Sequence, residues 1–348
     1  MTVTPDPSGS TAHDSGKDPA LSVPAPSRRS MSGGSGLGRN LGLVVALLLL
    51  CIIGVATSGE RFASVDNLLT VLRAASVIGV VSIGMTFVIT GGGIDLSVGA
   101  IVALSSVWAT TTGTQAMADD IGWVAMVFAA VVVGAACGAV NGLLVAYGRI
   151  VPFIATLAML AAARGLAEII SDRKTQIIRN QGFTDLFGSE PLGIPFIVVI
   201  FVVVAAGGWF LLNRTTFGRR TFAVGGNPEA ARLAGIKVQR HTVYLYALLG
   251  TTCGIAAVML MSRTTTGTST HGQLYELDAI AAVVIGGTLL SGGRGTVTGT
   301  LFGVLIFTVL TNVFTLNNLS ISAQAVAKGV IIVIAVLLQQ RIANRTTT

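Results

Sequence analysis

Ionisable side chains within long apolar runs are the residues of this sequence most able to do chemistry. Arg164 and Glu168 are four residues apart in one such run, so they share a helix face and can form an ion pair. Asp278 opens a later run, and Lys328 lies well inside the last one. Charged groups at such depth line polar pathways or move protons. Each is therefore a candidate pathway residue for a hydrophilic solute, although Glu168 and Asp278 could instead only reach headgroup water.

A glycine-rich stretch, TGGGIDLSVG at 90–99, places Asp95 and Ser97 at the start of an apolar run. Three successive glycines favour a tight turn, and Asp and Ser are residue types that cap helix N-termini. Asp95 is thus either a structural cap and turn organiser, which we favour, or an intramembrane functional group. A similar turn, SGGRG at 291–295, separates two later runs.

The hydrophilic segment 213–241 predicts a short helix after a glycine turn. Gly225 and Gly226 form the expected turn, Asn227 fits an N-cap, and Pro228 fits the first helical position. Gly235 is placed to end the helix. With its flanking basic residues this segment is either a docking element for a partner or a solvated basic loop held by lipid headgroups.

Several catalytic signatures are missing from the sequence. It contains no GxxxxGK[ST] phosphate loop, no HExxH, no CxxC and no GxSxG. The three cysteines, Cys51, Cys137 and Cys253, lie in separate apolar runs and predict buried hydrophobic side chains, with neither disulfide nor metal site. We therefore expect no catalysis, no bound cofactor and no metal in this chain. An intramembrane enzyme is the least favoured hypothesis.

The elements that must position these residues are membrane spans. Of 348 residues, 52% are hydrophobic and only 11% are charged, against about 25% charged residues in soluble domains. Apolar blocks of about 17–25 residues indicate transmembrane helices. The fold class expected is an all-α polytopic membrane protein, with a disordered tail at 1–38 and a membrane domain at 39–348. We expect about ten spans, some short or broken: 41–57, 68–90, 94–113, 121–147, 153–170, 193–212, 242–261, 278–291, 295–316 and 321–340.

The distribution of Lys and Arg predicts the orientation of the chain. With both termini in the cytoplasm, fourteen basic residues fall in the tails and inner connections and five in the outer ones. Acidic residues gather in the outer connections. The net charge of +7 is therefore a topology signal and does not indicate nucleic-acid binding.

Four stretches, taken together, resemble the permease subunits of bacterial ribose- and xylose-type ABC importers, within the branched-chain amino acid and monosaccharide permease superfamily. They occur in the family's order across about 60–340: GMTFVITGGGIDLSVGAIVAL at 84–104, VNGLLVAYGRIVPFIATLAML with RGLA at 140–167, GRRTFAVGGNPEAARLAGIKV at 218–238, and YELDAIAAVVIGGTLLSGGRGTVTGTLFG at 275–303.

The resemblance implies a ten-helix, multi-pass subunit of the bacterial plasma membrane that moves a sugar by alternating access. It implies four kinds of partner: cytoplasmic ATPase subunits that use ATP and Mg, an extracytoplasmic sugar-binding protein, a second permease copy and membrane lipid. The family's ATPase-coupling helix maps onto these positions: Gly226, Asn227, Pro228, Glu229, Ala230, Ala231, Arg232, Leu233, Ala234 and Gly235. The candidate pathway residues are Asp95, Ser97, Arg164, Glu168 and Asp278.

One rival hypothesis remains open at this point. An ion-coupled secondary transporter of a small polar solute would use Asp95, Glu168 or Asp278 as its coupling carboxylate, and broken spans also fit such carriers. It would need neither an ATPase nor the docking segment. The sequence does not identify the sugar, and it does not distinguish a homodimer from a heterodimer.

Overall fold

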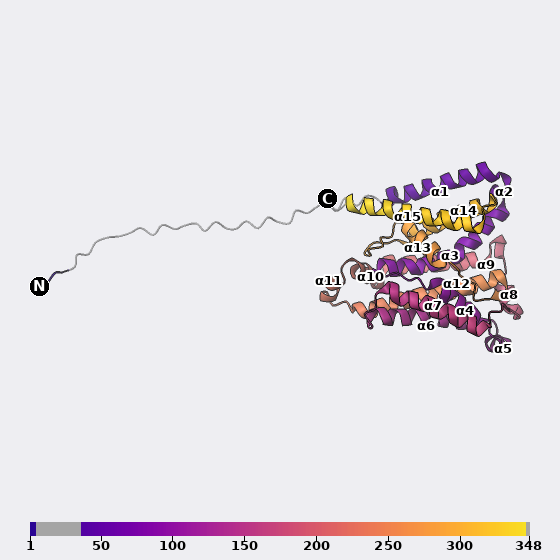
Figure 1. Cartoon of the computed structure of the whole chain (residues 1–348), viewed down its shortest axis with the longest axis horizontal. Helices are drawn as coiled ribbons and strands as arrows, with labels where there is room; N and C mark the ends of the chain where they lie inside the picture. Colours follow the sequence, from indigo (N-terminus) through magenta and orange to yellow (C-terminus); the bar gives the residue numbers. More distant parts are fainter. Residues whose placement is uncertain (5–35, 346–348) are drawn as a thin grey trace.

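The computed structural model describes residues 1–4 and 36–345 and is a helical bundle whose longer helices run side by side (Figure 1). Seven of the described helices are long and apolar enough to cross a membrane. They are α1 (Gly36–Ser58), α3 (Val65–Thr90), α6 (Val124–Ala146), α7 (Pro152–Ser171), α9 (Phe196–Arg214), α12 (Val238–Thr264) and α14 (Val297–Leu316). The last helix is α15 (Ile321–Arg345). The chain is thus an all-α polytopic membrane protein, as the sequence predicts.

Shorter elements lie between these helices and at the two ends of the bundle. They are α2 (Glu60–Ala63), α4 (Val98–Ala109), α5 (Thr112–Ile121), α8 (Gln181–Phe187), the 3-10 turn Pro191–Gly193, α10 (Thr216–Gly226), α11 (Pro228–Leu233) and α13 (Tyr275–Ile285). Two short strands, β1 (Gln176–Ile177) and β2 (Thr266–Gly267), pair antiparallel with Gln176 opposite Gly267. This pairing ties the connection after α7 to the one after α12.

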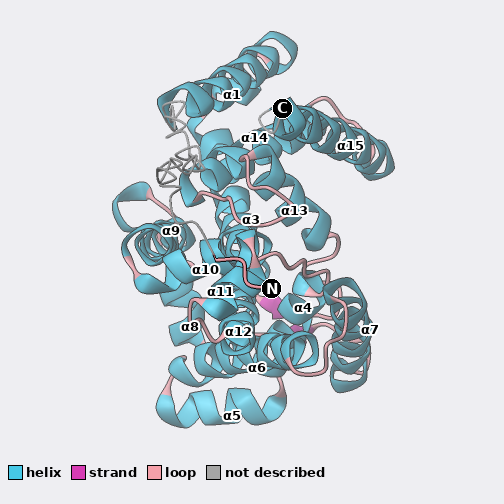
Figure 2. Cartoon of the chain, turned by 90° about the vertical axis from the view of Figure 1, so that its left-hand side faces the viewer, coloured by secondary structure: helices cyan, strands magenta, loops and turns pink. Residues whose placement is uncertain are grey.

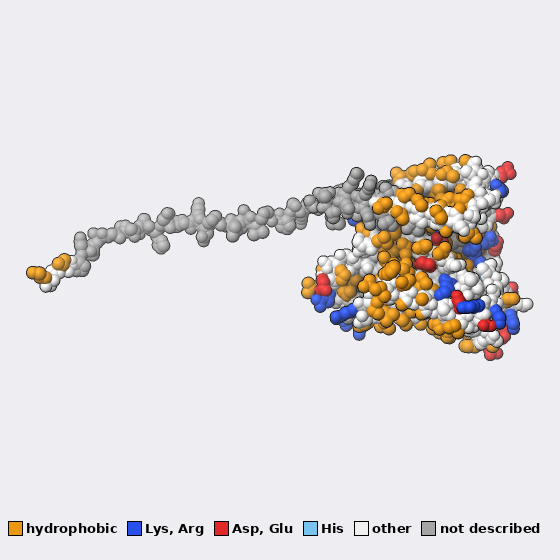
Figure 3. Space-filling model, viewed as in Figure 1, with side chains coloured by type: hydrophobic (Ala, Val, Ile, Leu, Met, Phe, Trp, Pro, Cys, Tyr) orange, Lys and Arg blue, Asp and Glu red, His pale blue; other side chains and the backbone are white. Residues whose placement is uncertain are grey.

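The two ends of the bundle differ in their elements. Helices α10 and α11 lie at one end, on the left in Figure 1, together with the start of α1 and the end of α15. Helices α2, α5 and α8 lie at the opposite end. We call these the α11 end and the α5 end. Side chains of both charges are visible at the α5 end in Figure 3, whereas basic side chains predominate at the α11 end.

Two of the predicted spans, α4 and α13, are half-length helices. Their 12 and 11 residues give lengths of about 18 and 16 Å, roughly half of a 30 Å hydrocarbon core. Each follows a stretch without α-helix, residues 91–97 before α4 and residues 265–274 before α13. Such backbone is tolerated at membrane depth only where protein covers it. Viewed from the α11 end, α4 and α13 lie between α7 and α15 (Figure 2).

The two half-helices belong to units that run in opposite directions. Helix α3 runs to the α11 end, and after the break α4 returns toward the α5 end. Helix α12 runs to the α5 end, and after its break α13 returns toward the α11 end. Inverted units of this kind are common in transport proteins, where the broken segments lie beside the solute path.

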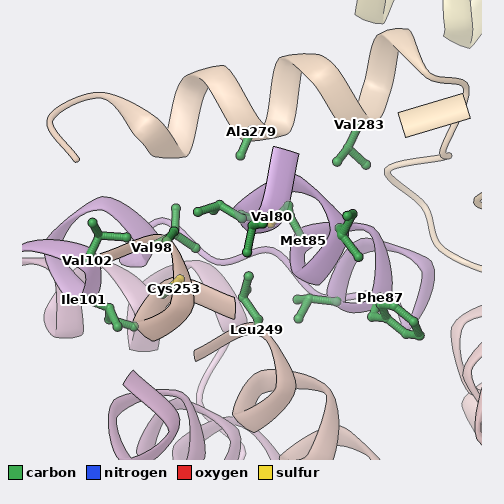
Figure 4. Close-up of a cluster of buried hydrophobic side chains, with 14 of the residues drawn as sticks. Val80, Met85, Phe87, Val98, Ile101, Val102, Leu249, Cys253, Ala279 and Val283 are labelled. Carbon is green, nitrogen blue, oxygen red and sulfur yellow. The ribbon is translucent and has the colours of Figure 1, made fainter. Parts of the chain in front are cut away.

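The core lies where these two units meet. Side chains from α3, α4, α12 and α13 pack together, among them Phe87, Ile101, Leu249 and Val283, all at most 2% exposed (Figure 4). Helices α6 and α12 approach closely through glycines. A Cβ added at Gly138 would lie 2.2 Å from the carbonyl oxygen of Tyr246. This is the small-residue packing through which helices associate in membranes.

The predicted spans each coincide with a helix, but several bounds differ. The span predicted at 94–113 begins as a helix only at Val98, because the backbone near Asp95 forms a turn, and α4 ends at Ala109 before α5 starts at Thr112. The span predicted at 278–291 begins earlier, at Tyr275, and ends at Ile285. The predicted disordered tail 1–38 falls mostly outside the described residues, and α1 begins at Gly36, inside its predicted boundary.

Candidate functional site

Helix α11 forms the tip of the α11 end. Asn227 accepts a hydrogen bond from the backbone N–H of Ala230 at 3.0 Å, and Pro228 follows as the first helical residue. Glu229 and Arg232 pair at 2.8 Å, and Gly235 ends the segment with a φ of +82°. The structure therefore confirms three predictions for this helix: Asn227 as the N-cap, Pro228 as the first helical residue and Gly235 as the residue that ends the segment.

Only one side of α11 is packed against the rest of the protein. Ala231 is 4% exposed, whereas Leu233 is 85% exposed at the tip. A leucine exposed to this degree, on a capped helix outside the apolar belt, has a shape and chemistry suited to a partner's groove.

The expected turn at Gly225 and Gly226 is wrong. Helix α10 continues through both glycines, and the chain becomes extended only at Asn227. The sequence does not predict helix α10, because its glycines, threonines and phenylalanines are poor helix formers. Its end is fixed by tertiary contact instead: a Cβ added at Gly225 would lie 1.8 Å from the carbonyl oxygen of Thr90.

Three glycine-containing segments meet beside α11. The backbone N–H of Gly293 donates to the carbonyl oxygen of Thr90 at 2.8 Å. A Cβ added at Gly292 would lie 2.7 Å from the carbonyl oxygen of Gly225 and 2.9 Å from the Cα of Gly92. We call these contacts, between the end of α3, the end of α10 and the connection from α13 to α14, the glycine junction. It joins the segment that carries α11 to both inverted units at the α11 end.

Asp95 is the centre of a buried polar cluster in the break before α4. Its Oδ1 accepts from the backbone N–H and the hydroxyl of Ser97, at 2.7 and 2.6 Å. Its Oδ2 accepts from the side-chain amide of Asn141 at 3.1 Å, and that amide also donates to the Ser97 hydroxyl at 2.9 Å. Asp95 and Ser97 are both 0% exposed. Asp95 therefore organises the turn, as favoured from the sequence, but neither side chain caps α4.

Arg164, on α7, holds the break before α13. Its Nη1 donates to the carbonyl oxygen of His271 at 2.9 Å and also to that of Ser269. The imidazole of His271 is held in turn, with Nδ1 3.1 Å from the Ser106 hydroxyl and Nε2 3.2 Å from the Thr264 hydroxyl. Carbonyls in a break have no helical partner, so the guanidinium supplies the missing donors.

The expected pair between Arg164 and Glu168 is not formed. Glu168 instead pairs with Arg173 at 3.2 Å near the end of α7, where both side chains are substantially exposed. The four-residue spacing was correct for one helix face, but the unpaired carbonyls of residues 265–274 compete for the Arg164 guanidinium. The Glu168 carboxylate therefore makes none of the hydrogen bonds that hold this break.

Asp278 and Lys328 form an ion pair between α13 and α15. The Lys328 Nζ lies 3.2 and 3.3 Å from the two carboxylate oxygens and 4.9 Å from the centre of the Phe307 ring. The side chains are 12% and 21% exposed. The sequence places both charges in spans but does not pair them, because they belong to different helices.

Some residues of the site are not predicted from the sequence. Asn141 completes the Asp95 cluster from α6, and Ser106 and His271 fix the break before α13. A polar residue in a glycine-rich apolar span was the only signal for Asn141. In residues 1–4 and 36–345, no group of three or more His, Cys, Asp or Glu residues could hold a metal ion.

A family model described as "Branched-chain amino acid transport system / permease component" matches residues 67–338. The chain belongs to this permease family. The permease is 44% identical over 308 residues to "Ribose import permease protein RbsC" of Bacillus subtilis, covering 88% of this chain and 94% of the relative. It is 37% identical to "L-arabinose ABC transporter permease protein AraH" of Azospirillum brasilense, covering 85% and 86%.

A third relative of the permease is "Fructose import permease protein FrcC" of Rhizobium meliloti, 36% identical over 306 residues, with 86% of this chain and 84% of the relative covered. No solved structure matches the permease. Its inverted units, half-helices and glycine junction thus belong to a transport subunit that crosses the bacterial inner membrane several times.

Proposed function

We propose that this chain is the membrane-spanning, non-catalytic subunit of an ATP-driven importer for a monosaccharide. Relatives named for ribose, arabinose and fructose import cover most of its length, which supports a sugar as the solute. The observation that carries the proposal is α11, a capped helix with Leu233 exposed at its tip and packed on one side only. ATP and Mg would be bound by the partner that α11 contacts.

The α11 end is the cytoplasmic end in this proposal, with both termini in the cytoplasm. Several basic residues lie at this end, in α10, in the first turn of α12 or in the neighbouring connections: Arg149, Arg219, Arg220, Lys237 and Arg240. Excess Lys and Arg in short loops marks the cytoplasmic side. The α5 end, with its acidic Glu60, Asp119 and Asp120, would then face the sugar-binding protein.

Coupling would pass from α11 through the glycine junction. When the ATPase subunits close, α11 moves with them, and the Gly225 backbone presses on Thr90 and Gly293. Thr90 ends α3 and Gly293 lies in the connection after α13, so the two inverted units would shift against one another. This supplies the two-state element that alternating access requires.

The solute path would run along the face formed by α7, the two half-helices and α15, completed by a second permease copy. Arg164 holds the break on this face, and the Asp278–Lys328 pair lies between α13 and α15. Glu276, partly exposed on the first turn of α13, joins Arg164 and Asp278 as a candidate pathway residue. Asp95 and Ser97 lie behind this face, fully buried, and support it.

Reconstitution tests this proposal. The chain is placed in proteoliposomes with an ABC ATPase and a sugar-binding protein from the same organism, and uptake of radiolabelled D-ribose, D-xylose, L-arabinose and D-fructose is measured. Uptake of at least one sugar should require Mg-ATP on the α11 side and the binding protein on the other. Uptake driven by an imposed proton gradient without ATP would instead establish the secondary transporter and overturn the importer.

A further inference from the structure

A basic pocket of about 490 Å³ lies beside α11, between α10 and α12. Arg220, Lys237 and Arg240 line it together with Phe217 and Tyr244, and no carboxylate is among its lining residues. None of the ion pairs formed by the described residues involves these three cations. The carboxylate on neighbouring α11, Glu229, is already held by Arg232 at 2.8 Å. The pocket therefore presents three cations without a counter-charge of their own.

The pocket is at the level where the spans end. Val243 packs against α6 near that helix's last turn, since a Cβ added at Gly142 would lie 2.7 Å from the Cα of Val243. Arg240 is one turn nearer the start of α12, at the α11 end, so its charge is level with the boundary of the apolar belt. At the end of α9, the Arg214 guanidinium lies 5.5 Å from the Trp209 ring centre, an arrangement typical of a membrane interface.

The pocket is basic at its outer edge and aromatic toward the membrane. Arg240 and Tyr244 are four residues apart on α12, so they share one helix face, and Lys237 is the N-cap residue just before this helix. Tyr244 is 58% exposed, one turn deeper than Arg240. A ligand that lies along these residues meets the cations first and the exposed aromatic ring next. A phospholipid has the matching order of groups, with its phosphate level with the cations and its acyl chain level with the ring.

We propose that this pocket binds the phosphodiester headgroup of an anionic phospholipid, with an acyl chain passing over Tyr244. An acidic segment of a protein partner would suit the cations equally, but it would leave the exposed Tyr244 ring on the membrane side without an apolar partner. Assigning the lipid to the inner leaflet rests on the orientation in the proposed function. The site itself depends only on the pocket and its position at the end of the spans.

A bound headgroup would connect two helices. Arg220 is on α10 and Arg240 on α12, and behind them the His241 Nε2 lies 2.9 Å from the Thr221 hydroxyl, which already joins the same helices. A phosphate bridging the two arginines would add a second link across this joint. Anionic lipid should therefore stabilise the folded chain against heat.

The test is a lipid titration of the delipidated full chain in a neutral detergent, with melting temperature as the readout. Dioleoyl-phosphatidylglycerol is compared with dioleoyl-phosphatidylcholine and with inorganic phosphate. Phosphatidylglycerol alone should raise the melting temperature at low concentration. In the variant Arg220→Gln with Arg240→Gln, its apparent affinity should fall by about 30-fold, because each cation near a headgroup contributes about one kcal/mol. The matched control is Arg214→Gln with Arg219→Gln, which removes two nearby arginines that do not line the pocket and should retain the affinity.

Three results would overturn the proposal. Equal effects of the two lipids would mean that no anionic site exists. An equal effect of inorganic phosphate would assign the pocket to a free anion, and equal losses in both variants would mean that only total charge matters. If the glutamine variant fails to fold, Arg220→Lys with Arg240→Lys keeps the charges and should retain the affinity. Lipid binding is measured without sugar or ATPase. The result therefore does not depend on whether the importer proposal holds, and the two proposals can fail separately.

Discussion

The backbone N–H of Gly293 donates to the carbonyl oxygen of Thr90 at 2.8 Å, next to the glycines that end α10. This bond joins the end of α3 to the connection after α13, so the two inverted units are linked where the α11 segment reaches them. Side chains are excluded from this contact. A movement of α10 would therefore be transmitted by backbone atoms, which deform less than a flexible side chain.

Gly225→Ala should disrupt this junction. The new Cβ would lie 1.8 Å from the Thr90 carbonyl oxygen, so backbone must move, at a cost of about 1–3 kcal/mol of folding free energy. We expect a lower melting temperature and less sugar transported per ATP hydrolysed. Gly226→Ala is the matched control, because its Cβ would meet nothing closer than the Gly293 Cα at 4.0 Å. Equal behaviour of the two variants would show that the junction does not constrain α10.

The Asp95 cluster predicts a rescue by exchange. Asp95→Asn places an amide donor near the donor amide of Asn141, and Asn141→Asp places two carboxylates together. Each single change should cost about 1–3 kcal/mol in unfolding free energy. The double exchange restores one carboxylate and one amide and should recover most of the loss, as measured by thermal unfolding of all four proteins. Additive losses would mean that these two side chains do not interact.

Arg164 should be needed for transport beyond its charge. Arg164→Lys keeps the charge, but its shorter side chain does not bring the ammonium to the position of Nη1, which donates to both carbonyls of the break. We expect sugar uptake to fall at least about tenfold, equivalent to one lost charged hydrogen bond, while ATP hydrolysis continues. Arg173→Lys, at a residue with an 83% exposed side chain, is the control and should transport normally. Full uptake by Arg164→Lys would show that the break needs only a positive charge.

The pair between Asp278 and Lys328 should behave as a unit. Lys328→Met leaves a mostly buried carboxylate without its cation, and about 1–3 kcal/mol of stability should be lost. Adding Asp278→Asn removes the unpaired charge, so the double variant should melt above the single one. Melting curves in the same detergent decide this. A double variant less stable than Lys328→Met would contradict the pairing.

Local signals in the sequence were sufficient for α11 and for most spans. Asn227, Pro228 and Gly235 act within one short helix, so residue type and spacing determine its start and end. Arg164 has the right spacing to pair with Glu168. Its guanidinium instead donates to the backbone carbonyls of Ser269 and His271, about a hundred residues away in the sequence. The contact of Gly225 with Thr90 is likewise tertiary. The sequence predicts a turn at these glycines, whereas the structure has the last residues of helix α10 there.

The most direct measurement of the coupling role of α11 is co-purification of the ATPase from native membranes in mild detergent. Leu233→Glu is compared with Leu233→Met and with the unmodified chain. Because Leu233 is 85% exposed, neither change should alter the melting temperature of the chain by more than a degree or two. We predict that the ATPase remains with the unmodified and methionine proteins and is lost from the glutamate variant. Retention of the ATPase by Leu233→Glu, or its absence from all three, would contradict docking at α11.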